Sequence, residues 1–376
     1  MPAKKIIVSA GGTGGHIIPA LSLCKELIRK ETAVYYIGNK DSMEFEIISK
    51  NDIPFYPINV QKIYRSFTIK HFLFPFKLIY SIFRCTKYFK MIRPDAFVGF
   101  GGFVAGAPAV AAWLCHCPIY LQEQNCKPGL TNIWTGKFAK AVFLAYEDSM
   151  QYFGKANCFV TGNPILGDGF LNASSDKSLN ESSSSSSYTP DSKKLLILGG
   201  SQGSLFINNL ILENLDWFRE NTIALIWQTG KRHLENIKSQ IPNYEDRESS
   251  KAIILFDFTD NIHEYYRQAD YIISRGGALS LAEIEIHKIP AFVIPLSTAA
   301  VNEQYHNARY MQNRNMGMMF EEKDRDLFIE KFNEFIKRAK DMYQEENETL
   351  HLTAAENIAD MLLKDSLNTP SQMESK

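Results

Sequence analysis

The sequence predicts an α/β protein made of two doubly wound domains that face each other across a cleft. Two openings of the form strand, glycine turn, helix carry this prediction, at residues 5–16 and, about 190 residues later, at residues 194–204. After each opening, short apolar strands alternate with segments of helical periodicity. The 376 residues also suffice for two domains that each bury a core of their own.

The first half of the chain opens with a strand at residues 5–9, which are apolar and rich in β-branched side chains. After the turn, apolar side chains repeat at helical spacing over residues 17–28. Further strands are expected at residues 34–37, 55–60, 96–100, 118–121, 141–145 and 159–161. Their nearly continuous apolar character is typical of a parallel sheet that is covered on both faces.

Serine dominates residues 172–192, which therefore cannot bury enough apolar surface to order themselves, and we expect a disordered insertion there. The second half then repeats the pattern of the first, with strands expected at residues 194–198, 224–228, 253–256, 271–274, 291–295 and 316–320. We expect an N-terminal domain over residues 1–163, a C-terminal domain over residues 193–345, and a helix and tail over residues 346–376. The last amphipathic helix, near residues 352–363, can pack on either domain.

Composition limits the class of protein. A net charge of −1 gives no global attraction to nucleic acid or to anionic lipid, so any such attraction has to come from a local patch. The six cysteines all lie in the first half and form no CxxC pair, which favours free, structural thiols in a reducing cytosol. The N-terminus lacks the features of a signal peptide, and no stretch approaches the roughly 20 apolar residues of a membrane span.

The first glycine turn, GGTGGH at residues 11–16, ends a strand and begins a helix. Its spacing is neither that of a dinucleotide-binding fingerprint nor that of a P-loop. Glycines allow close approach of a ligand, and the start of a helix favours an anion. His16 at the mouth of the turn is a candidate general base, because the pKa of histidine lies near working pH. A purely structural turn and a structural histidine are the alternatives.

Three more glycine turns follow predicted strands, at residues 99–106, 199–204 and 274–277. In the third turn, the hydroxyls of Ser201 and Ser204 can cap a helix or donate to a phosphate. Behind the fourth turn, Glu283 can accept hydrogen bonds from the hydroxyls of a ribose. A solvated helix glutamate is the alternative.

Two further segments carry weaker signals. The amide side chains of residues 302–308, among them Gln304, suit the hydroxyls of a neutral sugar, although polarity at the start of a helix explains them equally well. The only DxD-like triplet contains Asp324 and Asp326 and does not follow a glycine turn, so we expect no metal site there.

Residues 53–94 contain no Asp or Glu but eight Lys and Arg, interleaved with many aromatic side chains. A basic, aromatic helical segment is typical of a surface that lies on an anionic membrane. Part of the segment must be core, and nucleic-acid binding is an alternative that the near-neutral remainder of the chain disfavours.

Taken together, these motifs resemble the MurG family, bacterial UDP-N-acetylglucosamine (UDP-GlcNAc) transferases of peptidoglycan synthesis. The matching segments are GGTGGH (11–16), GFGGFVAGAP (99–108), LQEQNCKPGLTN (121–132), TGNPI (161–165), GGSQGS (199–204), SRGGALSLAEI (274–284) and NEQYHNA (302–308). The resemblance implies a GT-B fold with two Rossmann-like domains and links the chain to cell-wall biogenesis, cell shape and cell division.

The implied reaction moves GlcNAc from UDP-GlcNAc to the C4 hydroxyl of MurNAc in lipid I, with inversion and without a metal or other cofactor, forming lipid II. The implied location is the cytoplasmic face of the inner membrane, where residues 62–93 hold the protein peripherally. The implied partners are other cell-wall synthesis proteins, and nucleic acid is not among them. By the same resemblance His16 is the catalytic residue, and the substrate-binding residues are Thr13, Gly14, Gly15, Asn125, Ser201, Ala278, Leu279, Ser280, Leu281, Ala282, Glu283 and Gln304.

Three positions depart from the pattern of the family. Gln122 stands where a second histidine is usual, Leu166 replaces an arginine that would contact phosphate, and Phe103 replaces a tyrosine. The alternative functions are transfer to another lipid, such as diacylglycerol, and a catalytically inactive UDP-sugar-binding scaffold.

Overall fold

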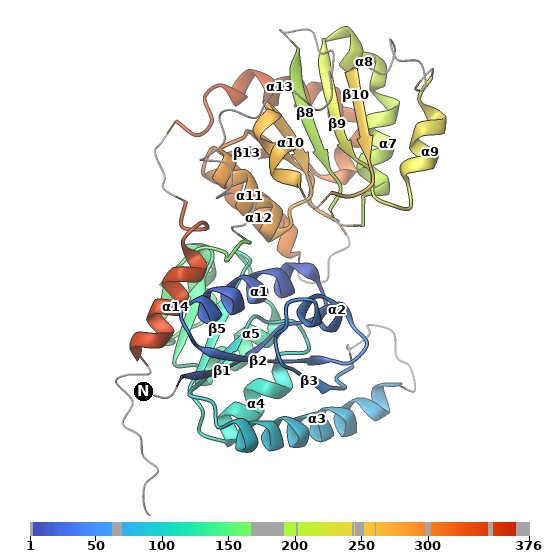
Figure 1. Cartoon of the computed structure of the whole chain (residues 1–376). Coiled ribbons are helices and arrows are strands. Elements are labelled where there is room, and N and C mark those ends of the chain that lie inside the picture. Colours follow the sequence, from blue (N-terminus) through green and yellow to red (C-terminus); the bar gives the residue numbers. More distant parts are fainter. Residues whose placement is uncertain are drawn as a thin grey trace, which may run out of the picture. The chain divides into compact units, whose positions relative to one another are not determined.

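The chain is described by a computed structural model that covers residues 3–61, 70–166, 192–200, 202–242, 244, 252–259, 261–297, 302–344 and 349–365. It forms two compact units (Figure 1). Unit 1 combines Met1–Leu166 with Thr349–Lys376, and unit 2 is Gly167–Glu348. The predicted serine-rich insertion, apart from Ser192, and Ser201 lie outside the described residues.

Unit 1 contains a parallel sheet in the order β3-β2-β1-β4-β5-β6-β7. Its strands are β1 (Lys5–Ser9), β2 (Ala33–Asn39), β3 (Phe55–Ile58), β4 (Ala96–Gly99), β5 (Ile119–Glu123), β6 (Ala141–Leu144) and β7 (Cys158–Val160). Its helices are α1 (Gly14–Arg29), α2 (Met43–Ser49), α3 (Lys70–Ile92), α4 (Gly106–Leu114), α5 (Leu130–Thr135) and α14 (Ala354–Asp365). Short 3-10 helices, η1 (Gly136–Phe138) and η2 (Glu147–Tyr152), complete it.

Successive residues of the inner strands of unit 1 enter two different cores, as expected for a sheet covered on both faces. Ile6 and Val8 of β1 pack in a cluster with side chains of α1, α2 and α14. Ile7, between them, packs in a second cluster with side chains of α3 and α4. This alternation explains why the strands are continuous apolar runs in the sequence.

Unit 2 repeats the plan with the strand order β10-β9-β8-β11-β12-β13. Its strands are β8 (Lys193–Leu198), β9 (Ile223–Gln228), β10 (Ile253–Phe256), β11 (Tyr271–Ser274), β12 (Ala291–Val293) and β13 (Gly317–Met319). Its helices are α7 (Leu205–Glu213), α8 (Leu215–Glu220), α9 (Leu234–Gln240), α10 (Ile262–Gln268), α11 (Ala278–His287), α12 (Glu303–Asn313) and α13 (Phe328–Ala339), with η4 (Glu322–Leu327) before the last.

Both sheets reverse their strand order at one point, between β1 and β4 in unit 1 and between β8 and β11 in unit 2. In an open parallel sheet, ligands bind beyond the carboxyl ends of the strands at such a switch point. All four glycine turns of the sequence follow one of these four strands. The topology therefore gathers the predicted site segments in pairs, one pair in each unit.

The predicted fold class is confirmed: each unit is a doubly wound parallel α/β domain. Each of the thirteen strands in the described residues lies where the sequence predicted it, with ends that shift by no more than two residues. The six cysteines form no disulfide with one another, and four of them are buried. No helix in the described part of the chain is long and apolar enough to cross a membrane.

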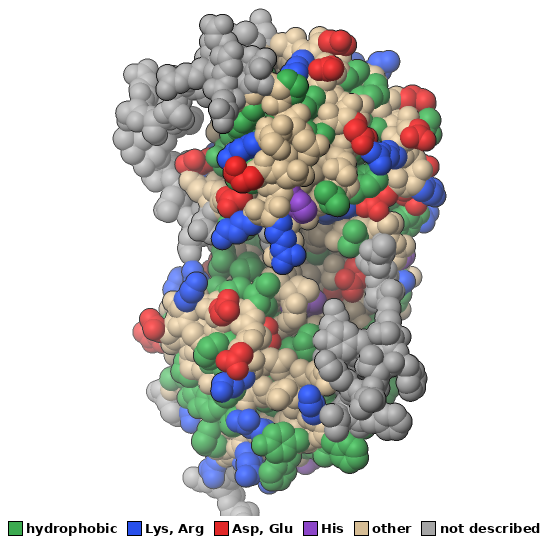
Figure 2. All heavy atoms as spheres, turned by 90° about the vertical axis from the view of Figure 1, so that its right-hand side faces the viewer, with side chains coloured by type: hydrophobic (Ala, Val, Ile, Leu, Met, Phe, Trp, Pro, Cys, Tyr) green, Lys and Arg blue, Asp and Glu red, His purple; other side chains and the backbone are tan. Residues whose placement is uncertain are grey.

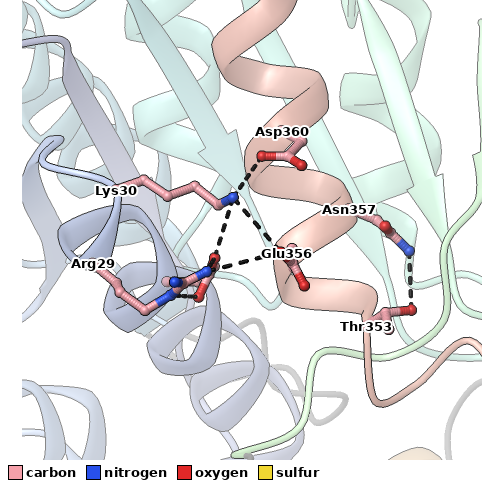
Figure 3. Close-up of polar contacts among 7 residues, drawn as sticks. Arg29, Lys30, Thr353, Glu356, Asn357 and Asp360 are labelled. Atoms are coloured by element: carbon pink, nitrogen blue, oxygen red, sulfur yellow. Dashed lines mark hydrogen bonds and ion pairs between the residues drawn. The ribbon is translucent and has the colours of Figure 1, made fainter.

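The last helix, whose location the sequence left open, packs on unit 1. Ile358, Ala359 and Leu362 of α14 are fully buried in the cluster that also contains side chains of α1. Around them, Lys30 at the end of α1 lies 2.6 Å from the carboxylate of Asp360 (Figure 3). Unit 1 is therefore built from two separate segments of the chain.

Candidate active site

The first two glycine turns of unit 1 touch backbone to backbone at the switch point. Gly12 and Gly102 have φ angles of +90° and +72°, which residues with side chains rarely adopt. A Cβ atom on Gly102 would lie 2.2 Å from the carbonyl oxygen of Gly11. These glycines are therefore required by the local fold, whatever the turn binds.

Gly14 and Gly15, by contrast, are not required by packing. A Cβ on Gly14 would meet no atom of the described residues within 4 Å, and one on Gly15 would meet Thr13 Oγ1 at 3.6 Å. Helix α1 begins here, and the side chain of its N-cap, Thr13, makes no capping hydrogen bond. Uncapped N–H groups and the positive end of the helix dipole favour an anion. This geometry supports the interpretation of the turn as a ligand-binding element.

His16 is the third residue of α1, and its Nδ1 lies 2.9 Å from Thr13 Oγ1. Burial lowers the pKa of the half-buried imidazole to about 4, so the ring is neutral near pH 7. If Nδ1 donates to Thr13, the lone pair of Nε2 is available to accept a proton. His16 is thus neutral and has a fixing partner, as a general base needs, but a pKa of about 4 makes it a weaker base than the ordinary histidine expected from the sequence.

The end of β5 is organised by Glu123, a carboxylate with 1% of its surface exposed. One oxygen accepts from the backbone N–H and the side chain of Asn125, at 3.0 and 3.1 Å. The other accepts from Gly129 N and Asn132 Nδ2, at 3.2 and 2.9 Å. A carboxylate with four donors fixes the loop after the strand, and it sets the orientation of the half-buried Asn125 at the strand end.

A buried polar network connects this strand end to the C-terminal segment. Gln122 Nε2 donates to Asn163 Oδ1 at 3.2 Å, and Asn163 Nδ2 donates to the carbonyl of Gln124 at 3.1 Å. The backbone N–H of Asn163 donates to His351 Nδ1 at 2.8 Å. Through these bonds, the segment before α14 supports the strand ends of unit 1.

In unit 2, Arg275 connects three strand ends. The guanidinium of this buried side chain donates to Ser204 Oγ at 2.6 Å and to the carbonyl of Ile294 at 3.1 Å, and it pairs with Glu322 at 2.6 Å. Ser204 is also the N-cap of α7, where its hydroxyl accepts from Ile207 N at 3.3 Å. The capping role suggested for Ser204 is confirmed, and its hydroxyl proton remains to be donated elsewhere.

Helix α11 begins after Gly277, which provides no side-chain cap. Among the residues predicted for the nucleotide, Ala278, Leu281 and Ala282 have buried side chains, whereas Leu279 and Ser280 are half-buried. The N–H of Leu281 already donates to Gly277 O at 3.0 Å. Only the N–H groups of the first turn of α11 are therefore in a position to meet an anion.

Glu283 lies on the second turn of α11 and is half-buried. Burial raises the pKa of its carboxyl to about 7, and a hydrogen bond from the Tyr266 hydroxyl, 2.9 Å from Oε2, opposes that rise. Near pH 7 the side chain therefore exists in both the protonated and the ionised form. Only the ionised form can accept hydrogen bonds through both oxygens.

Helix α12 is connected to the same turns. Asn307 Nδ2 donates to the carbonyl of Gly276 at 3.0 Å, and Gln304 Oε1 accepts from Leu296 N at 3.0 Å. The oxygen of the Gln304 amide is thus engaged by the loop after β12, whereas its NH2 group is a pair of donors. The structure brings Gln304 and the start of α11 to one edge of unit 2.

Comparison with known proteins agrees with this geometry. Residues 6–144 match the N-terminal domain of glycosyltransferase family 28, and residues 194–362 match its C-terminal domain. The UDP-N-acetylglucosamine–N-acetylmuramyl-(pentapeptide) pyrophosphoryl-undecaprenol N-acetylglucosamine transferase of Flavobacterium psychrophilum is 32% identical over 328 residues, which is 87% of each chain. The transferase of the same name from Francisella tularensis subsp. tularensis is 34% identical over 96% of this chain and 97% of its own.

The chain belongs to the MurG family of glycosyltransferases. Solved structures agree on the fold. Acinetobacter baumannii MurG has a TM-score of 0.76 at 24% identity and covers 96% of this chain and 99% of its own. Staphylococcus aureus MnaA, solved with UDP, has a TM-score of 0.66 at 16% identity over 99% of both chains. The two Rossmann-like units are those of the predicted GT-B fold.

The three departures from the MurG family pattern have different surroundings. Gln122 is completely buried within the polar network, so the residue at this position supports the strand end and does not reach a substrate. Leu166 is half-buried against the core that α14 shares, and Phe103 packs beside Gly12. A leucine side chain at residue 166 cannot donate a hydrogen bond to a phosphate. Any phosphate contact therefore has to come from other groups.

Three residues around the site received no role from the sequence: Glu123, Arg275 and Tyr266. Glu123 and Arg275 are charged residues next to apolar strands, a signal that marks a buried, paired charge. Tyr266 carries no such signal, because a tyrosine in an amphipathic helix is more often part of the core.

Proposed function

We propose that this chain transfers GlcNAc from UDP-GlcNAc to the C4 hydroxyl of MurNAc in lipid I, with inversion, and thereby forms lipid II. Its relatives of that name match it over nearly their whole length, 87% and 97% for the two named above. The observation that carries the mechanism is the neutral His16 on an uncapped helix start in unit 1. The alternative lipid acceptors and the inactive scaffold remain as outcomes of the test.

In the proposed reaction, the C4 hydroxyl attacks the anomeric carbon while the bond from that carbon to the phosphate oxygen breaks. His16 Nε2 takes the hydroxyl proton, and UDP leaves with the electron pair. Thr13 fixes the imidazole through Nδ1 and supports the imidazolium that forms. The uncapped N–H groups at Gly14 and Gly15 stabilise the negative charge that develops on the diphosphate.

The donor is held by unit 2 in this proposal. Glu283 accepts the ribose hydroxyls, and the NH2 group of Gln304 donates to the GlcNAc hydroxyls. The first turn of α11, which begins at Ala278, offers the backbone N–H groups of Leu279 and Ser280 to the diphosphate, together with Ser201. Asn125 in unit 1, oriented by Glu123, contacts the acceptor or the transferred sugar.

The test is a transfer assay with radiolabelled UDP-GlcNAc and either lipid I or diacylglycerol in mixed micelles. We expect label in lipid II only. Transfer only to diacylglycerol would contradict the proposed acceptor, and UDP binding without transfer to any lipid would support the scaffold. A chelator is expected to leave the rate unchanged, and strong inhibition would contradict a metal-independent reaction.

We further propose that unit 1 lies peripherally on the cytoplasmic face of the membrane through the basic, aromatic segment of residues 62–93. Within its described part, α3 exposes Phe76 and Phe83 by 72% and 57%, and Lys87 lies 5.0 Å from the Phe83 ring. Trp134 on α5 is 71% exposed. Apolar and basic side chains are interspersed at the lower end of the molecule in Figure 2, where α3 and α4 lie. A mixture of this kind suits an anionic lipid surface.

Vesicle flotation tests this contact. Phe76→Ser with Phe83→Ser is expected to lower binding to vesicles that contain anionic phospholipid by up to roughly 10³-fold, at about 2 kcal/mol for each exposed ring that enters the interface. Phe159→Ser, which removes a ring that is 42% exposed on β7, is the matched control and should bind like the unchanged protein. Equal binding of all variants would contradict the proposed surface.

A further inference from the structure

Tyr266 is buried beside Glu283, the predicted ribose-binding carboxylate, and has no role in the proposed function. Only 1% of its surface is exposed, and its hydroxyl lies 2.9 Å from Glu283 Oε2. A phenol donates to a carboxylate, and burial beside that carboxylate keeps the pKa of Tyr266 well above its usual value. The hydroxyl is therefore a permanent donor to Oε2 at working pH.

The tyrosine ring is fixed as firmly as its hydroxyl. It stacks on His287, one turn after Glu283 on α11, with 5.0 Å between ring centroids and 10° between ring planes. The ring also belongs to the buried core cluster that contains Leu196 of β8 and Ile284 of α11. A ring held between a strand and a neighbouring helix defines where the carboxylate oxygen must lie.

We propose that Tyr266 is a positioning residue for the donor nucleotide: by holding Glu283 Oε2, it aims the carboxylate so that its remaining acceptor sites meet the two ribose hydroxyls. This inference rests on the proposed role of Glu283 and deepens it. A glutamate side chain has three rotatable bonds, and fixing it before the ligand arrives removes an entropic cost of binding. The hydrogen bond also favours the ionised carboxylate, the form that accepts hydrogen bonds from hydroxyls.

The experiment compares UDP with 2′-deoxy-UDP by calorimetric titration of the full-length chain. The unchanged protein is expected to prefer UDP by roughly tenfold or more, the effect of one hydrogen bond to a charged group. Tyr266→Phe removes only the hydroxyl, and we expect it to weaken UDP roughly tenfold and to reduce the preference over the deoxy ligand. A change that merely loosened the core would weaken both ligands alike.

Tyr265→Phe is the matched control. Tyr265 is the neighbouring tyrosine of the same helix, and its ring stacks on Phe256 at 4.8 Å. Within the described residues its hydroxyl makes no hydrogen bond, so its removal should change neither the affinity nor the preference. A second control combines Tyr266→Phe with Glu283→Ala, where the loss of the hydroxyl should have no further effect on the preference, because the two residues act as one unit.

The outcomes separate this inference from the proposed function. If Glu283→Ala leaves the preference for UDP unchanged, Glu283 does not bind the ribose. The roles proposed for Glu283 and for Tyr266 are then both overturned. If Glu283→Ala abolishes the preference but Tyr266→Phe keeps it, the role of Glu283 stands and the positioning role of Tyr266 is overturned. If Tyr266→Phe alone proves unstable, the double variant is compared with Glu283→Ala. A further loss of the preference for UDP in the double variant overturns the inference, and an unchanged preference supports it.

Discussion

The two units support their site loops with buried side chains of opposite charge. In unit 1, Glu44 and Glu123 are 2% and 1% exposed and accept N–H groups from the turns around them. In unit 2, Arg275 directly follows β11, one of the two strands at the switch point, and donates to a hydroxyl and a carbonyl. The carboxylates of unit 1 thus occupy N–H donors, whereas the guanidinium of unit 2 occupies oxygen acceptors.

The difference matches what each unit is proposed to bind. Carboxylates consume backbone N–H donors, and unit 1 keeps its free donors at the uncapped start of α1 beside His16. An arginine consumes acceptors instead and leaves the N–H groups of the turns in unit 2 for an anion. The free N–H groups of both units are therefore proposed to serve the anionic diphosphate, and unit 1 adds His16 for the neutral sugar hydroxyl that reacts.

The largest expected effect separates chemistry in unit 1 from binding in unit 2. His16→Ala is expected to lower kcat for transfer to lipid I by roughly 10²- to 10⁴-fold, because the proton acceptor is lost. The Kd for UDP should stay within about twofold, since unit 2 is unchanged. Steady-state kinetics and calorimetry measure the two quantities. His116→Asn, at an exposed histidine of unit 1 with φ of 53°, is the control. A fall in kcat of less than about tenfold would remove His16 as the base.

Removing the buried charge of each unit tests the comparison directly. Arg275→Met removes the guanidinium that pairs with Glu322 and donates to Ser204, so we expect unit 2 to lose about 3 kcal/mol of stability and UDP to bind at least tenfold more weakly. Glu123→Leu removes the acceptor that four donors share and should destabilise unit 1 by a similar amount, about 3 kcal/mol, without changing the affinity for UDP. Hydrogen exchange read peptide by peptide assigns each loss to its unit. Equal effects of both variants on UDP binding would contradict the opposite roles.

The two units should also respond to different ranges of pH. With its pKa at about 7, Glu283 ionises near neutrality, so the affinity for UDP should fall roughly tenfold from pH 8 to pH 6. Glu283→Gln should remove that part of the dependence. His16, with its pKa lowered from 6.5 to about 4, stays neutral over the same range, and kcat should not decline with its protonation there.

The corresponding effects on folding have opposite signs. The unfolded chain binds the His16 proton more tightly than the folded one, so this group makes stability rise with pH between about 4 and 6.5. Glu283 binds its proton more tightly in the folded chain, so stability falls as pH rises from 4.5 to about 7. Denaturation of the single variants at pH 5 and pH 7 separates the two contributions, and identical pH dependence in both variants would contradict the assignment.

The sequence predicted the elements of this fold more completely than their connections. Each strand is a short apolar run followed by a turn, and this local pattern can be recognised without knowing the partner strand. The donor–acceptor pair of Asn163 and His351 spans 188 positions, and Arg275 meets Ser204 across 71. Sequence periodicity does not predict such pairs, because only the topology of the sheets brings them together. The glycine turns and His16 were found because glycine spacing after a strand is itself local.

The smallest effect concerns how the C-terminal segment is attached to unit 1. Lys30→Met breaks the ion pair with Asp360, whose carboxylate is 43% exposed, and should cost less than about 1 kcal/mol because water and salt screen exposed pairs (Figure 3). Leu362→Ala, on the buried face of the same helix, should cost about 2–5 kcal/mol. Urea denaturation at low and high salt measures both changes. A loss of stability on Lys30→Met as large as that on Leu362→Ala would mean that charge, and not apolar burial, joins α14 to the first helix.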